Sequence, residues 1–300
     1  MKRNIQDILE EIRNALPELT ASQKKVGIFI CEHPQVLGLL SLEDFAKRIN
    51  VSPPTVTRFC NALGYKGFLE FSRSTQRVVE KEISHAGLFR HAFARSTQSA
   101  AINSVVQEVV ERDARAMLAL LDTYPAESIE RCVAAMRNAA AIGIVGRMSA
   151  YPLAVYFEQL LAKICDKVCP LSGSEVTQAA TVSRMDETSL LFCIAFPRYA
   201  KAPVALARQA KQRNAFVVAL TNSEFSPLAP VSDILFTLDV NIVSYIDLMG
   251  PVMSLINILC VEFAHAQYDA TEQRLSDYDA LVEAEFFLKE GRHEHHRRRT

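Results

Sequence analysis

The chain has 300 residues, 49% of them hydrophobic, and a formal net charge of −1, which excludes wholesale disorder and a global positive field. At roughly 150 residues per domain, this length predicts about two domains. The seven cysteines are an odd number without framework spacing, which indicates a reducing compartment and predicts a cytoplasmic protein. The first 20 residues carry charges throughout and are not a signal peptide.

The chain has no segment that we interpret as a membrane span, and we expect no membrane partner. Its most apolar window, residues 242–264, contains Asp247, Pro251, Asn257 and Glu262. Charged residues are rare inside the bilayer, so this window predicts a buried helix that packs on a sheet or in a subunit interface.

The patterns divide the chain into four parts. Residues 1–83 carry short helical patterns, and residues 84–115 predict a helical linker. Residues 116–270 alternate short apolar runs with helical patterns, and residues 271–300 predict a C-terminal helix with a basic tail.

The N-terminal part predicts helices only. The predicted helices cover residues 5–16, 20–31, 41–49, 52–63 and 67–81. Ser41 and Ser52 are N-caps, and Gly64 has the position of a C-terminal helix glycine. Two short helices separated by a tight polar turn are typical of a helix-turn-helix.

The fourth helix of this part has the pattern of a DNA recognition helix. Val56, Phe59, Cys60 and Leu63 form its inward face, which leaves Thr55, Thr57, Arg58 and Asn61 for the outward side. Small hydroxyls and an arginine near a helix N-terminus suit phosphates and base edges. Between residues 20 and 81 nine Lys/Arg face five Asp/Glu, a local charge of +4. A small helical bundle with a mixed surface is the alternative.

The run SLEDFAKRINVSPPTVTRFCNALGYKGFLEF resembles the helix-turn-helix of the RpiR family of bacterial transcriptional regulators. The matching positions are Val51, Ser52, Thr55, Val56, Arg58, Phe59, Cys60, Leu63, Gly64, Tyr65, Gly67, Phe68, Glu70 and Phe71. The resemblance implies that a double-stranded DNA operator is the partner and that Ser52, Thr55, Thr57 and Arg58 lie at the DNA. Lys66 and Lys24 are candidate phosphate contacts, with solvated lysines as the alternative.

The second domain has the pattern of a doubly wound α/β fold with a parallel sheet. Apolar runs at 141–146, 167–171, 189–196, 216–220 and 234–238 alternate with helical patterns, among them 149–165 and 202–213. Ligands bind such sheets at the carboxyl ends of the strands, here the loops 146–150, 172–174, 197–200 and 221–226. The complete fold prediction is therefore multidomain, an all-α helix-turn-helix domain followed by this α/β domain.

This domain resembles the sugar isomerase (SIS) domain, the effector domain of RpiR-type regulators, whose members typically bind phosphosugars. The family's Gly-x-Gly-x-Ser turn is altered here, since Met148 takes the second Gly position and Ser149 comes one residue early. Its Ser-x-Ser-Gly-x-Thr loop is lost, because those four positions hold Ala195, Pro197, Arg198 and Ala200.

Two interpretations follow from the lost loop. In the first, side chains rebuild an anion site for a sugar phosphate or a related effector. The candidate ligand-binding residues are Gly146, Arg147, Ser149, Arg198, Tyr199, Thr221 and Ser223. In the second, the domain binds no ligand and only dimerises. A two-fold operator needs two recognition helices, so we expect a homodimer or homotetramer.

We expect no enzyme activity, no cofactor and no metal. Isomerisation of a sugar needs a general base and acid, and no histidine lies between His91 and His265. Glu158, Glu175 and Glu187 are near the strand-end loops, but surface positions explain them equally well. A sugar-phosphate isomerase or SIS-type binding protein, with a helical N-terminus for assembly, remains the alternative.

Overall fold

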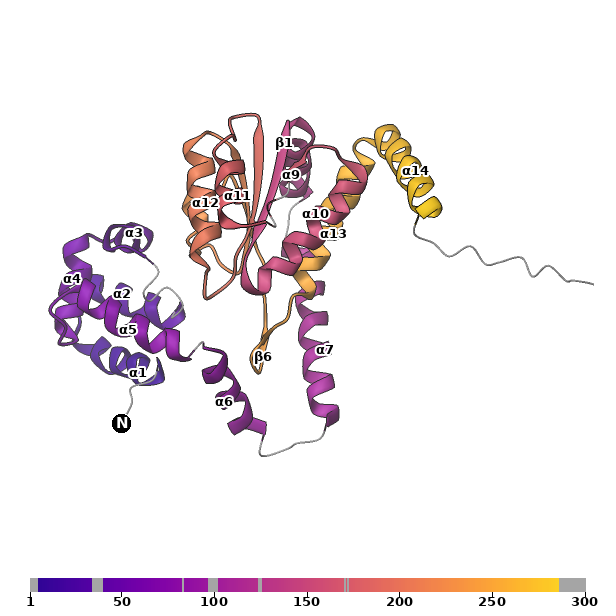
Figure 1. Ribbon diagram of the computed structural model, residues 1–300. Helices are drawn as coiled ribbons and strands as arrows, with labels where there is room; N and C mark the ends of the chain where they lie inside the picture. Colours follow the sequence, from indigo (N-terminus) through magenta and orange to yellow (C-terminus); the bar gives the residue numbers. More distant parts are fainter. Residues whose placement is uncertain are drawn as a thin grey trace, which may run out of the picture.

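The computed structural model describes residues 5–33, 40–82, 84–96, 102–123, 126–169, 171 and 173–285. These residues form an N-terminal helical domain and a sheet domain, and helical segments run between them (Figure 1). No helix in these ranges combines the length and apolar character that crossing a membrane requires.

The helical domain has the five helices that the sequence predicts. They are α1 (Ile5–Ala15), α2 (Ala21–Glu32), α3 (Leu42–Arg48), α4 (Pro53–Ala62) and α5 (Phe68–Glu82). The Asp44 amide donates to the Ser41 hydroxyl at 3.1 Å, which caps α3. Gly64 ends α4 with a φ of +83°, a conformation that glycine adopts without strain. Local caps and turns therefore set the helix boundaries.

Aromatic side chains fill the core of this domain. Phe45, Phe59 and Phe71 are buried among α2 to α5, and the Phe59 and Phe71 rings pack edge to face with centroids 6.2 Å apart. Val56 and Cys60 share the buried face of α4 with Phe59. This packing fixes which side of α4 remains exposed.

Within the described residues, four helices follow the helical domain, and the last of them packs on the sheet. They are α6 (His85–Ser96), α7 (Ile102–Leu118), α8 (Leu120–Thr123) and α9 (Ala126–Asn138). Most of α7 falls within the predicted linker, and this helix packs against α13 (Gly250–His265) of the sheet domain. The boundaries at residues 83, 115 and 270 remain predictions.

The second domain is a five-stranded parallel sheet. The strands are β1 (Ala141–Gly146), β2 (Val168–Cys169), β3 (Ser189–Ile194), β4 (Phe216–Thr221) and β5 (Ile234–Thr237), in the order β2-β1-β3-β4-β5. Successive side chains point to opposite faces, so Ile144 joins the core beneath one helix layer and Val145 the core beneath the other. One layer holds α9, α10 (Tyr151–Ile164) and α13, and the other holds α11 (Glu175–Val182) and α12 (Lys201–Gln212) (Figure 1).

The prediction of one long helix across residues 242–264 is wrong at its start. A short hairpin, β6 (Ile242–Val243) and β7 (Ile246–Asp247), comes before α13. Ser244 takes a φ of +57° in the turn, and Pro251 lies in the first turn of α13, where proline is tolerated. The final helix is α14 (Tyr268–Glu285), and the tail from residue 286 onward lies outside the described residues.

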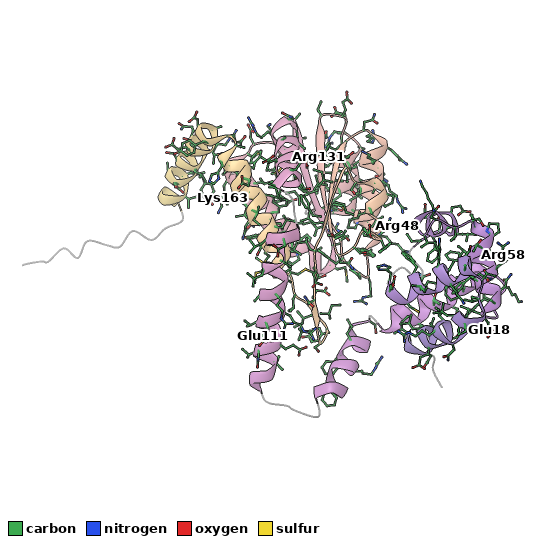
Figure 2. All side chains as sticks on the ribbon, turned by 180° about the vertical axis from the view of Figure 1, so that it is seen from behind. Glu18, Arg48, Arg58, Glu111, Arg131 and Lys163 are labelled. Atoms are coloured by element: carbon green, nitrogen blue, oxygen red, sulfur yellow. The ribbon has the colours of Figure 1, made fainter. Side chains whose placement is uncertain are left out.

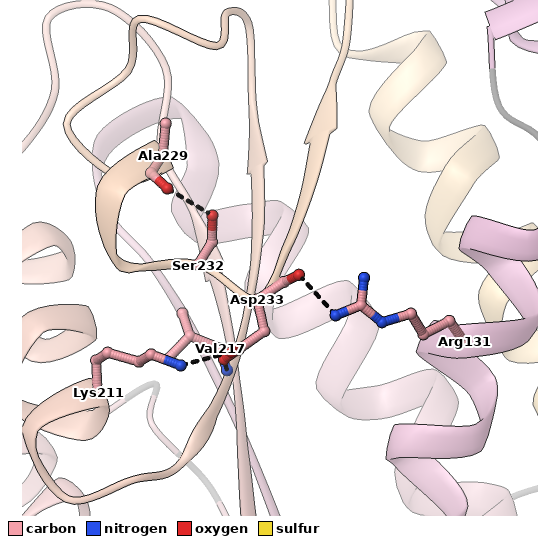
Figure 3. A network of polar contacts seen from close by, with 6 residues as sticks. All are labelled: Arg131, Lys211, Val217, Ala229, Ser232 and Asp233. Atoms are coloured by element: carbon pink, nitrogen blue, oxygen red, sulfur yellow. Dashed lines mark hydrogen bonds and ion pairs between the residues drawn. The ribbon is translucent and has the colours of Figure 1, made fainter. Parts of the chain in front are cut away.

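Asp233, directly before the edge strand β5, forms hydrogen bonds with three neighbouring segments (Figure 3). Its carboxylate accepts hydrogen bonds from the Val217 amide at 2.9 Å and from the Lys211 ammonium at 2.5 Å. Its carbonyl accepts from the Arg131 guanidinium at 3.2 Å. One residue thus joins β4, β5, α9 and α12.

Candidate functional site

The outward side of α4 carries polar side chains, as the sequence predicts for a recognition helix. Ser52, Arg58 and Asn61 are exposed and Thr57 is half-buried. Figure 2 shows Arg58 on the side of the helical domain that faces away from the sheet domain. The exposed face of α4 is therefore not covered by the rest of the described chain.

Thr55 does not lie on this outward side, which corrects the placement expected from the sequence. Its side chain is 6% exposed because it turns toward the core beside Val56. The Thr55 and Ser52 hydroxyls are 2.9 Å apart, and the Arg58 guanidinium donates to the Thr55 oxygen at 3.1 Å. Thr55 thus holds the guanidinium end of the Arg58 side chain, whereas its own hydroxyl is withdrawn from solvent.

A shallow hollow of about 520 Å³ adjoins α4 at the start of α5. Lys66 and Arg73 are exposed at its rim, and its wall includes Gly67, which lies next to Thr57. The Lys66 amide donates to the Glu70 carboxylate at 2.6 Å, which leaves the Lys66 ammonium outside that bond. Arg73 was not among the predicted site residues; it lies on α5, whereas Lys66 precedes that helix.

The strand order marks the edge of the sheet that carries the predicted ligand-binding loops. In a sheet of order 2-1-3-4-5 the connections reverse between β1 and β3, and sheets of this type generally bind ligands at the carboxyl ends of these strands. Gly146 ends β1, and a Cβ there would lie 2.4 Å from the Ala150 oxygen, so only glycine permits this turn. Ser149 is exposed in the same turn.

The two arginines in the loops after β1 and β3 differ in their hydrogen bonding. The Arg147 guanidinium donates to Gln178 Oε1 at 2.8 Å and to the Gly173 carbonyl at 3.3 Å, which ties the β1 loop to α11. Arg198, after β3, is exposed and has no hydrogen-bond or ion-pair partner within the described ranges. Of these two arginines, Arg198 is therefore the one whose guanidinium is available to an incoming anion.

Tyr199 joins the loop after β3 to the loop after β4. Its hydroxyl donates to Asn222 Oδ1 at 2.6 Å, and burial raises the pKa of this phenol to about 12, so it remains a donor at neutral pH. Thr221 is buried, with no partner for its hydroxyl in the described chain, and Ser223 Oγ accepts from the Phe225 amide at 3.1 Å. Asn222 was not among the predicted site residues, because no local motif distinguishes it.

The three glutamates near the strand-end loops, Glu158, Glu175 and Glu187, show no arrangement for acid–base chemistry in the structure. Glu158 is buried and accepts from the Leu171 amide at 2.8 Å, which anchors the chain after β2. Glu175 and Glu187 are exposed. No group of three or more His, Cys, Asp or Glu side chains in the described ranges is arranged to hold a metal. Three histidines, His293, His295 and His296, lie in the tail outside those ranges.

Comparisons with known proteins place both domains. Residues 6–81 match the helix-turn-helix domain of the rpiR family, and residues 135–261 match the SIS domain. An uncharacterised HTH-type transcriptional regulator of Caldanaerobacter subterraneus is 25% identical over 228 residues, which covers 76% of this chain and 78% of the relative. HexR of Escherichia coli, an HTH-type transcriptional regulator, is 24% identical over 236 residues, or 78% of each chain.

A solved structure shares the fold. The Vibrio vulnificus NanR protein, complexed with ManNAc-6P, superposes with a TM-score of 0.63 at 18% identity and covers 92% of this chain and 98% of its own. Both domain matches, their order and the named relatives agree. The chain is an RpiR-type transcriptional regulator, in which an rpiR-family helix-turn-helix domain precedes a SIS domain.

Proposed function

We propose that this regulator binds a double-stranded operator through α4 and responds to a phosphorylated, sugar-derived effector at the carboxyl ends of β1 and β3. The observation that carries the effector proposal is Arg198, which is exposed and has no partner among the described residues, and which precedes Tyr199 in the loop after β3, near the point where the strand order reverses. The protein acts in the cytoplasm, where the operator is found.

The DNA contacts come from the exposed side of α4. Arg58 presents a guanidinium, which forms paired hydrogen bonds with a guanine edge, and Thr57 and Ser52 add hydroxyls. Lys66 and Arg73 neutralise phosphates beside the groove. Thr55 contributes by positioning Arg58. One chain supplies one such helix, so a two-fold operator requires a homodimer or homotetramer.

The effector site consists of side chains where most SIS domains use a phosphate loop. Arg198 binds the phosphate, because a guanidinium pairs with phosphate oxygens in a fork geometry. Tyr199, Ser149, Thr221 and Ser223 supply neighbouring hydroxyls, and Gly146 and Arg147 shape the wall. The ManNAc-6P in the NanR structure supports a phosphorylated amino sugar as the first compound to test.

A second function, a SIS domain that binds no ligand and only assembles the regulator, has one observation in its favour. Arg147, which lies in the β1 loop, is already held by Gln178 and Gly173. We propose no isomerase activity, because Glu158 is bonded to a backbone amide and no histidine precedes His265 on the strand-end loops.

A thermal-shift series separates these functions. The purified protein is heated with ManNAc-6P, glucose 6-phosphate or the unphosphorylated sugars. A ligand at about 100 times its Kd stabilises the folded state by about 2.7 kcal/mol, which raises Tm. We expect a shift with a sugar phosphate that is lost in Arg198→Ala and kept in Arg208→Ala, an exposed arginine on α12. The absence of any shift would favour the assembly-only function.

A further inference from the structure

A side chain of the SIS domain lies in the core of the helix-turn-helix domain. Phe225, in the loop after β4, is 5% exposed and belongs to the aromatic cluster of α2 and α3. Its ring centroid lies 5.3 Å from that of Phe29 and 4.8 Å from that of His33. The Arg48 guanidinium lies over the Phe225 ring, 4.4 Å from its centroid. The helical domain thus surrounds this phenylalanine on several sides.

Arg48 also binds Glu224, the residue before Phe225. Its Nη2 donates to the Glu224 carbonyl at 2.6 Å and lies 3.2 Å from Glu224 Oε2. Figure 2 shows Arg48 on the side of the helical domain that faces the sheet, opposite Arg58. The contact between the domains therefore leaves the recognition helix α4 uncovered.

The same loop reaches the proposed effector site at its other end. Asn222 accepts the hydrogen bond of Tyr199 at 2.6 Å, only three residues before Phe225. Between them the loop is a stiff turn, because the Phe225 amide donates to Ser223 Oγ at 3.1 Å and the Ser226 amide to the Ser223 carbonyl at 3.0 Å. A short hydrogen-bonded turn therefore links Asn222 to Phe225.

We propose that residues 221–226 are a latch that couples effector occupancy to the position of the recognition helix. The proposal rests on the effector site proposed above. An anion held by Arg198 and Tyr199 takes the Tyr199 hydroxyl from Asn222, the turn shifts, and Phe225 and Glu224 leave the helical domain. The docked form is the DNA-binding form, because it holds α4 outward at a fixed orientation. Release lowers operator affinity, since two loosely held helices engage two half-sites less effectively.

Hydrogen exchange of the full-length protein tests the latch without any ligand. We expect Phe225→Ala to accelerate exchange at the end of α2 and in α3 by at least about tenfold, as expected for a locally opened unit. Arg48→Gln is a milder variant that keeps the core packed and changes exchange in the same direction. Phe89→Ala, at a 51% exposed phenylalanine on α6, is the matched control and leaves α2 and α3 unchanged.

Tyr199→Phe distinguishes a latch from a static contact. This variant removes one hydroxyl at the strand end and touches no residue of the helical domain. The latch predicts faster exchange in α2 and α3, whereas a change confined to residues 195–200 and 221–226 would overturn it.

The affinity for ManNAc-6P tests the coupling from the effector site to the helical domain. Reciprocal coupling predicts that Phe225→Ala binds it several-fold more tightly than the wild type does. If ManNAc-6P binds neither protein, the effector proposal fails for that compound, while the Tyr199→Phe exchange result still decides the latch. Equal, measurable affinities of the two proteins would contradict the latch alone.

Discussion

The Arg58 guanidinium donates a hydrogen bond to the Thr55 hydroxyl, 3.1 Å away and one turn earlier on α4. The acceptor is buried and the donor exposed, so the bond anchors a surface arginine to the core. An anchored guanidinium loses less side-chain entropy when it meets a base edge. If α4 reads DNA as proposed, its specificity depends in part on a residue that does not face the DNA.

Replacement of Thr55 by Val tests this anchor. The variant keeps the shape of the side chain and loses the hydroxyl, so we expect a loss of about 1 kcal/mol in unfolding free energy. Operator affinity falls as well, measured by fluorescence anisotropy. Thr75→Val is the control, because Thr75 is a buried threonine on α5 bonded to the Phe71 and Ser72 carbonyls. Equal operator affinities of the two variants would contradict a role for Thr55 in positioning Arg58.

Gly146→Ala tests the turn at the end of β1. The new Cβ would lie 2.4 Å from the Ala150 carbonyl oxygen. Because this contact is with backbone, it cannot be relieved by rotating a side chain. We expect a destabilisation of about 1–3 kcal/mol, measured by urea denaturation, since overpacking a rigid site forces the backbone to move. Gly173→Ala is the comparison, because its nearest contact is an ordinary 3.5 Å to Thr177 Cβ. A Gly146→Ala protein as stable as the wild type would show that the turn opens without cost.

Asp233→Ala tests the fastening of β5. The variant leaves the Val217 amide without its carboxylate partner at 2.9 Å and removes the ion pair with Lys211. Because the carboxylate is charged and partly buried, we expect a loss of about 2 kcal/mol in the free energy of unfolding. Asp239→Ala, at an exposed aspartate after β5, should change stability by less than about 0.5 kcal/mol. Similar effects of the two changes would contradict the network.

The cysteines predict an alkaline limit to stability. Burial raises the pKa of Cys60, Cys132 and Cys260 to about 12, from an ordinary value near 9. In the unfolded chain these thiols release protons above pH 9, while in the folded chain they retain them until about pH 12. The unfolded state therefore binds fewer protons in this window, and the free energy of unfolding falls as the pH rises.

The same burial predicts thiol reactivity. At pH 8 the thiolate is the reactive form, so iodoacetamide should modify half-buried Cys169 well before Cys132 or Cys193, as followed by peptide mass spectrometry. Early modification of Cys132 or Cys193 in the folded protein would contradict the packing of the sheet domain.

The helical domain could be predicted closely because its signals are local. Ser41, Ser52 and Gly64 lie at helix ends, and the predicted ends agree with the structure within one or two residues, although the Ser52 hydroxyl contacts the Thr55 hydroxyl and caps no backbone amide. The strands were equally visible as buried apolar runs. In contrast, the hairpin before α13 depends on Ser244 at positive φ, which its residue type does not indicate.

The candidate sites were less predictable, because they depend on contacts between distant segments. The inward turn of Thr55 is set by the packing of α4, and the sequence shows only its polarity. Asn222 and Phe225 contact Tyr199 and Phe29 through the tertiary structure alone. Arg147 was expected to be free for an anion, but Gln178 belongs to a helix, α11, that the sequence analysis did not predict.

The most direct test of the account is the selection of binding sites from a random duplex library by the wild type and by Arg58→Ala. We expect the wild type to enrich a two-fold symmetric sequence whose half-sites are separated by about 34 Å, one turn of DNA, or a multiple of it. Arg58→Ala should enrich no such sequence while still binding DNA weakly through its lysines. A wild type that enriches no sequence, or an Arg58→Ala protein that enriches the same site equally well, would contradict the assignment of α4 as the recognition helix.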